Sequence, residues 1–225
     1  MLVHTSEAVA AAPVETQELS ALRSTFETNT FAPLAVTQAF LPFIRETGAR
    51  VVFMSALCAG MTPPLLGGLC ASKAALECTS ISVFMWNARC TPPYWYLSYH
   101  LHTHTHLPTT ALADALRREL APYAISVSSI EPSTVPAPAA AEAAAQAGPV
   151  YAHLFVDDKK APAVSLVAPA TAQEASFIMR ALIHSVSSPH PKVRYPAGRV
   201  GPVPARLVAA LSWVLPLRLQ DALLV

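Results

Sequence analysis

Glycine is scarce in this chain, and the scarcity limits what the chain can bind. It has 7 glycines among 225 residues, against 21 prolines. Nucleotide pyrophosphates are often held by a glycine-rich turn that joins a strand to a helix N-terminus, because glycine lets the backbone approach the phosphates. No such cluster of glycines occurs in the sequence. The sequence therefore shows no sign of this kind of phosphate-binding turn.

Charged residues are also few and evenly balanced. They make up 13% of the chain, and 15 basic against 14 acidic residues leave a net charge of +1. This balance lacks the electrostatic footprint of a protein that binds nucleic acid or an acidic partner, so we expect neither. Apolar residues make up 53%, which predicts a packed chain rather than a disordered one.

Long apolar runs and cysteine motifs are missing as well. The four cysteines, Cys58, Cys70, Cys78 and Cys90, form no C-x-x-C pair and have no zinc-finger spacing, so we expect inert buried thiols. The N-terminus lacks the pattern of a secretory signal, which favours a cytoplasmic location. The apolar tract from Leu207 to Leu215 is too short to span a bilayer, although it would suit a peripheral membrane contact.

Residues 17–47 read as one long helix with a broken apolar stripe. Pro33 cannot donate a backbone hydrogen bond, which predicts a kink or bulge near Asn29. Gly48 is placed to cap the helix C-terminus. The residues of the stripe recur at spacings of three and four: Leu22, Phe26, Asn29, Pro33, Val36 and Phe40.

The remaining elements alternate between strand and helix, which predicts an α/β fold with a parallel sheet. Residues 50–55 read as a buried strand, because residues 51–53 are apolar without alternation, and residues 125–130 read as a second buried strand. A helix follows Gly67. Further helices are expected at 139–146, 171–186, 203–215 and 217–224. The inward face of the helix at 171–186 is predicted to hold Ala175, Ile178, Met179, Leu182 and Ile183.

The segment from Ile81 to about Ala113 interrupts a helix. If it is left out, residues 72–80 run with continuous helical periodicity into residues 114–120. Its alternating His-Thr run is what a CA repeat encodes, so we interpret the segment as a translated intron; the alternative is a genuine surface loop. Its four imidazoles would face one way in an extended chain, but no carboxylate or thiolate accompanies them, and we expect no metal site.

The most informative stretch is a buried strand that ends in Ser55, followed by a helix that carries Lys73. Polar residues at the carboxyl end of such a strand lie where open α/β sheets place ligands. Ser55 and the run Ala71-Ser-Lys-Ala-Ala-Leu-Glu77 resemble the active-site segment of the short-chain dehydrogenases/reductases, of the kind that act on steroid and retinoid alcohols. That family has a serine followed by Tyr-x-x-x-Lys, and Leu69 stands here at the tyrosine position.

The resemblance implies catalytic roles for Asn29, Ser55 and Lys73. In the family, the serine hydroxyl polarises the carbonyl, and the lysine lowers the tyrosine pKa and binds the nicotinamide ribose. The asparagine holds a water that relays the proton. Leu69 cannot transfer a proton, and acid–base groups contribute about 10²–10⁴ in rate. Cys70 is a poor substitute, because one helical step turns it about 100° away from position 69, which shares a helical face with Lys73.

The resemblance also implies a cofactor, NAD or NADP, with Lys73, Pro132 and Val135 as binding residues. The segment 131–135 resembles the part of the family whose backbone approaches the nicotinamide, and Ser133 stands there in place of a glycine that would allow close approach. No metal is implied. Binding by this chain is in question, because the sequence has no glycine-rich turn.

The fold implied is a partial Rossmann-like, doubly wound parallel sheet without its first βαβαβ half, a single incomplete domain over 1–225. Residues 2–7 lie where the family has a strand followed by Asn-Asn-Ala-Gly. The implied activity is NAD(P)-dependent oxidoreduction of an apolar secondary alcohol or ketone, with the chain expected to be inactive as written. The alternatives are a non-catalytic pseudoenzyme that pairs as a homodimer, and a defective gene model of an active enzyme.

Overall fold

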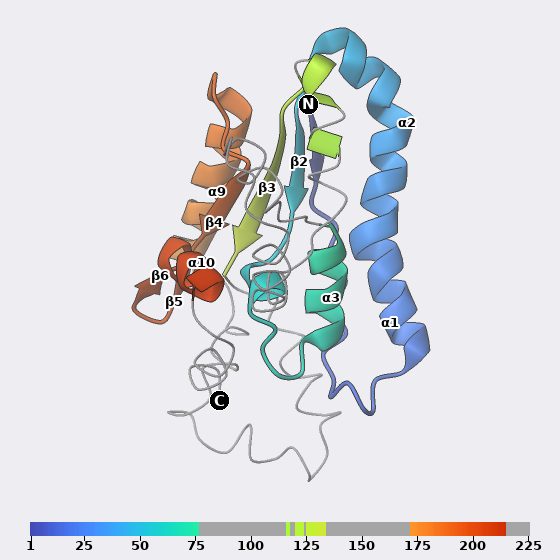
Figure 1. Ribbon diagram of the computed structural model, residues 1–225, viewed down its shortest axis with the longest axis vertical. Helices are drawn as coiled ribbons and strands as arrows, with labels where there is room; N and C mark the ends of the chain where they lie inside the picture. The colour runs from blue at the N-terminus through green and yellow to red at the C-terminus, as the bar shows by residue number, and fades with distance from the viewer. Residues whose placement is uncertain (77–115, 118–119, 124, 134–171, 215–225) are drawn as a thin grey trace, which may run out of the picture.

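The computed structural model describes residues 1–76, 116–117, 120–123, 125–133 and 172–214. Its centre is a four-stranded parallel sheet with the strand order β1-β2-β3-β4 (Figure 1). The expected α/β class with a parallel sheet is therefore confirmed. The strands are β1 Leu2–His4, β2 Val51–Met54, β3 Val127–Pro132 and β4 Arg194–Ala197.

The register of the sheet brings the ends of distant segments together. Val51 of β2 pairs with Leu2 on one side and with Val127 on the other, and Ile130 of β3 pairs with Tyr195. All four strands run the same way, so their carboxyl ends share one edge of the sheet (Figure 1). The segments that follow β1, β2 and β3 meet at this edge, where α/β proteins bind their ligands.

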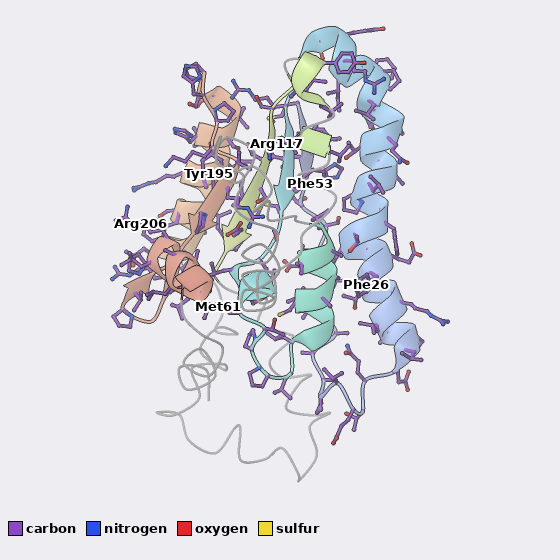
Figure 2. All side chains as sticks on the ribbon, viewed as in Figure 1. Phe26, Phe53, Met61, Arg117, Tyr195 and Arg206 are labelled. Atoms are coloured by element: carbon purple, nitrogen blue, oxygen red, sulfur yellow. The ribbon has the colours of Figure 1, made fainter. Side chains whose placement is uncertain are left out.

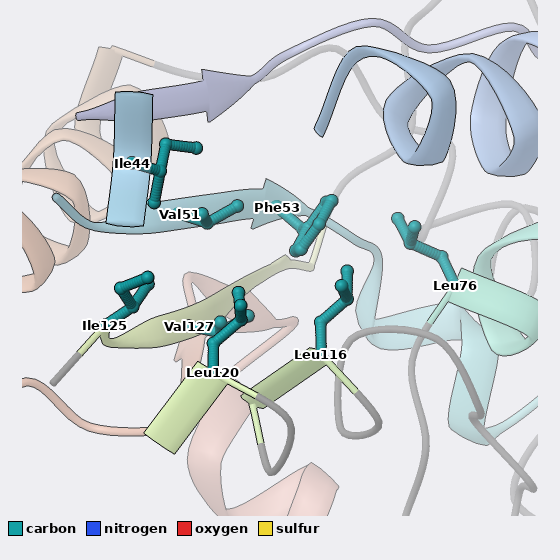
Figure 3. Packing of buried hydrophobic residues seen from close by; sticks show 8 residues of the cluster. All are labelled: Ile44, Val51, Phe53, Leu76, Leu116, Leu120, Ile125 and Val127. Carbon is teal, nitrogen blue, oxygen red and sulfur yellow. The ribbon is translucent and has the colours of Figure 1, made fainter. Parts of the chain in front are cut away.

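Helices cover both faces of the sheet, as a doubly wound fold requires. Val51 and Phe53 pack with residues of α2 Ala32–Thr47 and α3 Gly67–Leu76, whereas Val52 faces α9 Ala172–Ser187. Val51, Val52 and Phe53 are at most 1% exposed, which explains why β2 lacks polar alternation. The first cluster is drawn in Figure 3: Ile44, Val51, Phe53, Leu76, Leu116, Leu120, Ile125 and Val127.

Beside the sheet, the C-terminal elements form a small unit of their own. The antiparallel pair β5 Arg199–Val200 and β6 Val203–Pro204 leads into α10 Ala205–Val214. This helix packs on the short 3-10 helix η2 Leu57–Gly60, and a second 3-10 turn, η3, spans Ala121–Tyr123. Tyr195 of β4 lies beside α9 (Figure 2), where its hydroxyl hydrogen-bonds His184 Nδ1 at 2.9 Å.

The long first helix contains the expected bulge. It consists of α1 Leu19–Phe26, a π-helical segment η1 Glu27–Phe31 and α2, and Asn29 lies inside η1. A π turn inserts one extra residue into a helix and is typical of functional positions. Gly48 caps the helix with φ of 59°, in the left-handed region that favours glycine. Both sequence predictions are confirmed.

The apolar stripe predicted for this helix is confirmed at Pro33 and wrong further along α2. Val36 is 41% exposed and Phe40 50% exposed, and the buried residues of α2 are Pro33, Thr37 and Ile44. Beyond Pro33 the inward positions move on, to Thr37 and Ile44.

The inward face predicted for α9 needs a similar correction. Ala175, Met179 and Ile183 are exposed. The face that packs on the sheet is displaced by about one residue and holds Phe177, Ile178, Ala181 and Leu182. The helices predicted at 139–146 and 217–224, and the segment 81–113 with its histidine run, lie outside the described residues. None of the described helices is long and apolar enough to cross a bilayer.

His4 gives the fold a dependence on pH. Its Nε2 lies 2.9 Å from Thr37 Oγ1, and its ring stacks on Phe53 with centroids 4.9 Å apart. Burial lowers the pKa of His4 below its ordinary value of 6.5. The unfolded chain therefore binds a proton at this residue at a higher pH than the folded chain does.

We predict that this histidine makes the free energy of unfolding fall as the pH drops below about 6.5. The urea midpoint at pH 7.5, 6.5 and 5.5 measures the effect. A His4→Gln variant, which cannot titrate, should show a shallower decline over the same range. Parallel declines in the two proteins would contradict the prediction.

Candidate functional site

Ser55 follows β2 directly at the carboxyl edge of the sheet. Its backbone N–H donates to the Ile130 carbonyl at 2.8 Å, which ties it to the neighbouring strand β3. The residue is only 2% exposed, yet its hydroxyl has no hydrogen-bond partner among the described residues. Leaving a buried hydroxyl unsatisfied costs about 1–3 kcal/mol, and such groups are often found where a ligand or a reacting group belongs.

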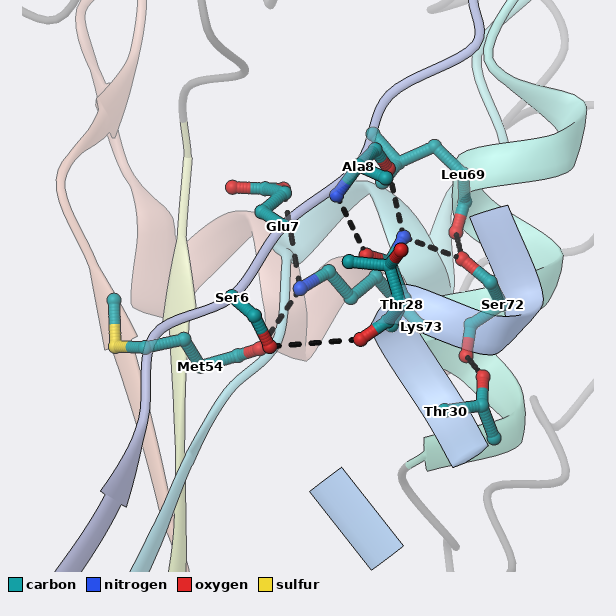
Figure 4. A network of polar contacts seen from close by, with 10 residues as sticks. Ser6, Glu7, Ala8, Thr28, Thr30, Met54, Leu69, Ser72 and Lys73 are labelled. Carbon is teal, nitrogen blue, oxygen red and sulfur yellow. Dashed lines mark hydrogen bonds and ion pairs between the residues drawn. The ribbon is translucent and has the colours of Figure 1, made fainter. Parts of the chain in front are cut away.

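Lys73 reaches the same place from α3. Its side chain is fully buried, and its Nζ donates to the Met54 carbonyl, one residue before Ser55, at 3.0 Å. A carboxylate oxygen of Glu7 lies 4.0 Å from the same nitrogen (Figure 4). The structure thus brings the ammonium group next to the strand end that carries Ser55, as the sequence predicted for two residues of one site.

Asn29 is tied to the chain around it. Its Oδ1 accepts from the Ala8 backbone N–H at 2.7 Å, and its Nδ2 donates to the Ala8 carbonyl at 2.8 Å and to Ser72 Oγ at 2.9 Å. The neighbouring Thr30 hydroxyl donates to the Ser72 carbonyl at 2.9 Å. These bonds join η1, α3 and the segment after β1, so Asn29 positions backbone in this structure.

Leu69 occupies the helical turn before Lys73 and is fully buried. It packs in an apolar cluster that includes Ala56, Leu66 and Cys70. Among the described residues, this cluster surrounds Leu69 with apolar side chains and thiols. A hydrogen bond with Cys70 and burial raise the pKa of the Cys58 thiol well above its ordinary value.

Glu7 is the residue of this site that the sequence reasoning did not single out. Its side chain is 29% exposed and extends toward Lys73 from the segment after β1 (Figure 4). Burial raises the pKa of the Glu7 carboxyl, and the Lys73 ammonium partly offsets that rise. One signal was present in the sequence: a carboxylate at the position where the resembling family has a glycine.

The residues predicted near a cofactor are only partly described. Pro132 ends β3 beside Ala197 of β4, and Val135 lies outside the described residues. The hydroxyl of Ser133 is buried against Gly198 and has no hydrogen-bond partner among the described residues. Gly198 has φ of 108°, and a Cβ there would overlap that hydroxyl, so this glycine makes room for Ser133.

Metal chemistry has no support in the part of the chain that the structure describes, where no three metal-ligating side chains gather. The groups that do gather are a buried ammonium, a carboxylate, an unpartnered hydroxyl and an amide. Of these, the ammonium and the hydroxyl could donate hydrogen bonds that orient and polarise a carbonyl oxygen.

Known proteins with similar sequences and folds point to one family. Residues 1–83, which include Asn29, Ser55 and Lys73, match the family model described as short chain dehydrogenase. Retinol dehydrogenase 5 of Mus musculus is 26% identical over 212 residues, which cover 84% of this chain and 55% of that protein. The chain thus spans about half the length of this curated relative.

Two solved structures share the fold. A short-chain dehydrogenase from Streptomyces avermitilis superposes with a TM-score of 0.57 and 22% identity, over 95% of this chain and 63% of the other. A short chain dehydrogenase from Burkholderia cenocepacia J2315, solved with NADP, gives 0.58 and 18%, over 100% of this chain and 68% of the other.

We predict that Asn29→Ala lowers the free energy of unfolding by about 2–4 kcal/mol, because it leaves buried backbone and hydroxyl groups unsatisfied. Urea unfolding measures the loss. Thr47→Ala is a matched control, since it removes an exposed hydroxyl that bonds the Phe43 carbonyl in the same long helix, and it should change stability by less than about 0.5 kcal/mol. Equal losses in the two variants would show that Asn29 does not clamp this site.

Proposed function

We propose that the chain is a member of the short-chain dehydrogenase/reductase family, that its site is that of an NAD(P)-dependent oxidoreductase for an apolar secondary alcohol or ketone, and that the chain as written does not complete the reaction. Asn29, Ser55 and Lys73 support the class of reaction. The apolar substrate is supported by the relative named retinol dehydrogenase 5 and by the apolar cluster around Leu69.

One observation carries the proposed loss of activity: Leu69 is fully buried one turn before Lys73, while the Ser55 hydroxyl is buried without a partner among the described residues. In the family, a tyrosine hydroxyl takes part in proton transfer at this helical position. A leucine offers no proton and no hydrogen bond to replace it. Since positioned acid–base groups supply about 10²–10⁴ in rate, the missing hydroxyl alone would reduce turnover by that factor.

The residues around Lys73 do not fit a nicotinamide ribose as they stand. The Lys73 side chain is fully buried, and its ammonium is engaged by the Met54 carbonyl and the Glu7 carboxylate. A ribose hydroxyl at the ammonium would have to compete with these two groups. Together with the absence of a glycine-rich turn from the sequence, this supports weak or no cofactor binding by the chain as written.

The test restores the hydroxyl. We predict that Leu69→Tyr, given NADH or NADPH at millimolar concentration to offset weak binding, oxidises it in the presence of a simple apolar ketone at a rate at least about 10² above that of Leu69→Phe. Both variants place a ring in a buried position and share an overpacking cost of about 1–3 kcal/mol. The phenylalanine variant therefore isolates the hydroxyl, and both are also made in a Glu7→Gly background that removes the carboxylate beside Lys73.

The unmodified chain should show no turnover under the same conditions. Saturable turnover by the unmodified chain that disappears in Lys73→Met would contradict the proposed inactivity. Equal rates for the tyrosine and phenylalanine variants in both backgrounds would contradict the proposed role of position 69. Thermal melts of every variant establish that the compared proteins are folded.

A further inference from the structure

The Lys73 ammonium is a charge that the fold must compensate. Its side chain has no exposed surface, and a buried charge is tolerated when it is paired and hydrogen-bonded. The Met54 carbonyl at 3.0 Å supplies a hydrogen bond, and the Glu7 carboxylate at 4.0 Å supplies the opposite charge. Glu7 therefore takes a polar position at Lys73 that a bound molecule could otherwise use.

The segment that carries Glu7 is held on both sides. One residue before it, the Ser6 hydroxyl donates to the Thr28 carbonyl at 3.5 Å. One residue after it, the backbone N–H and carbonyl of Ala8 are both bound by the Asn29 side chain, at 2.7 and 2.8 Å. Figure 4 shows Ser6, Glu7 and Ala8 passing beside Lys73. With both neighbours anchored, the carboxylate is directed at the ammonium by the backbone, and the contact is built into the fold.

We propose that the Lys73 ammonium forms a carboxylate-binding site that the chain's own Glu7 occupies, and that this site accepts a small carboxylate from solution once Glu7 is removed. The inference rests on the proposed function in one respect: it takes Lys73 to be the residue that meets a ligand in this family. Glu7 then acts as an internal competitor. It explains why the surroundings of Lys73 do not fit a ribose, and it identifies the residue that would have to leave.

The partial exposure of Glu7 decides how the site can be filled. The Glu7 side chain is 29% exposed to solvent, while the Lys73 ammonium 4.0 Å from it is fully buried. Truncation to glycine therefore opens a path from solvent to the ammonium and leaves a space where a carboxylate had been. Acetate and formate carry the same group as the removed side chain and are small enough to occupy that space.

The experiment is a rescue of Glu7→Gly by acetate. The melting temperature of the variant is measured in 100 mM sodium acetate and in 100 mM sodium chloride at the same pH. Binding with a Kd near 10 mM would raise it in acetate by about 3–6 °C. The unmodified chain and the double variant Glu7→Gly with Lys73→Met serve as controls, and neither should distinguish acetate from chloride.

A difference between acetate and chloride that is the same in all three proteins, or absent from all three, overturns the proposal. If Glu7→Gly is unfolded in chloride, the readout becomes recovery of the melting transition. Acetate should then restore it, and Lys73→Met should restore it in the absence of acetate; failure of both also overturns the proposal. No cofactor or substrate enters this experiment, so its outcome is separate from the turnover test of position 69.

Discussion

The burial of the Lys73 ammonium is the constraint around which the described site is arranged. Moving such a charge out of water costs several kcal/mol even after the protein relaxes, so its surroundings must supply polar groups at short range. The Met54 carbonyl at the end of β2 and the Glu7 carboxylate after β1 both do so. The parallel register of β1 and β2, in which His4 pairs with Phe53, places both groups at the same edge of the sheet. The segments at the carboxyl edge of the sheet are thus arranged around the charge of Lys73 on α3.

The π-helical segment at Glu27–Phe31 serves the same arrangement from the opposite side. It directs Asn29 inward, where one amide binds the backbone of Ala8 and the hydroxyl of Ser72. Removing the bulge would turn this amide away and release both the segment that carries Glu7 and the contact to α3. The π-helical segment therefore both bulges the first helix and, through Asn29, holds the backbone beside Glu7.

Much of the fold could be predicted from the sequence, because local patterns determine it. The apolar run of β2 predicted a buried parallel strand, Pro33 predicted a bulge near Asn29, and Gly48 predicted the helix end. The inward faces of α2 and α9 were displaced by about one residue. In α2 the displacement begins after Pro33, which is buried as predicted. Asn29 lies in the bulge that was expected near it, but the partners of its amide depend on the path of the segment after β1.

The pairing of Glu7 with Lys73 lay beyond sequence reasoning for a similar reason. The two residues are far apart in the chain, and their contact depends on the strand register and on a segment held by Asn29. Ser133 and Gly198 form another such pair: a serine at a position where glycine was expected is accommodated by a glycine with φ of 108° on the segment after β4. In both cases the departure from the family pattern is visible in the sequence, while its consequence is visible only in the fold.

The most direct test of this account is the reactivity of Lys73 toward a lysine-acylating reagent. The native protein is treated briefly with a small active ester, and acylation at Lys73 and at the exposed Lys192 is quantified by peptide mass spectrometry, with the urea-unfolded chain as reference. The account predicts that Lys192 reacts at the same rate in both states, while Lys73 reacts at least about 10² more slowly in the native state, because only opening of the fold exposes it. Equal native rates at Lys73 and Lys192 would show that the ammonium is not buried, and the account of the site would be wrong.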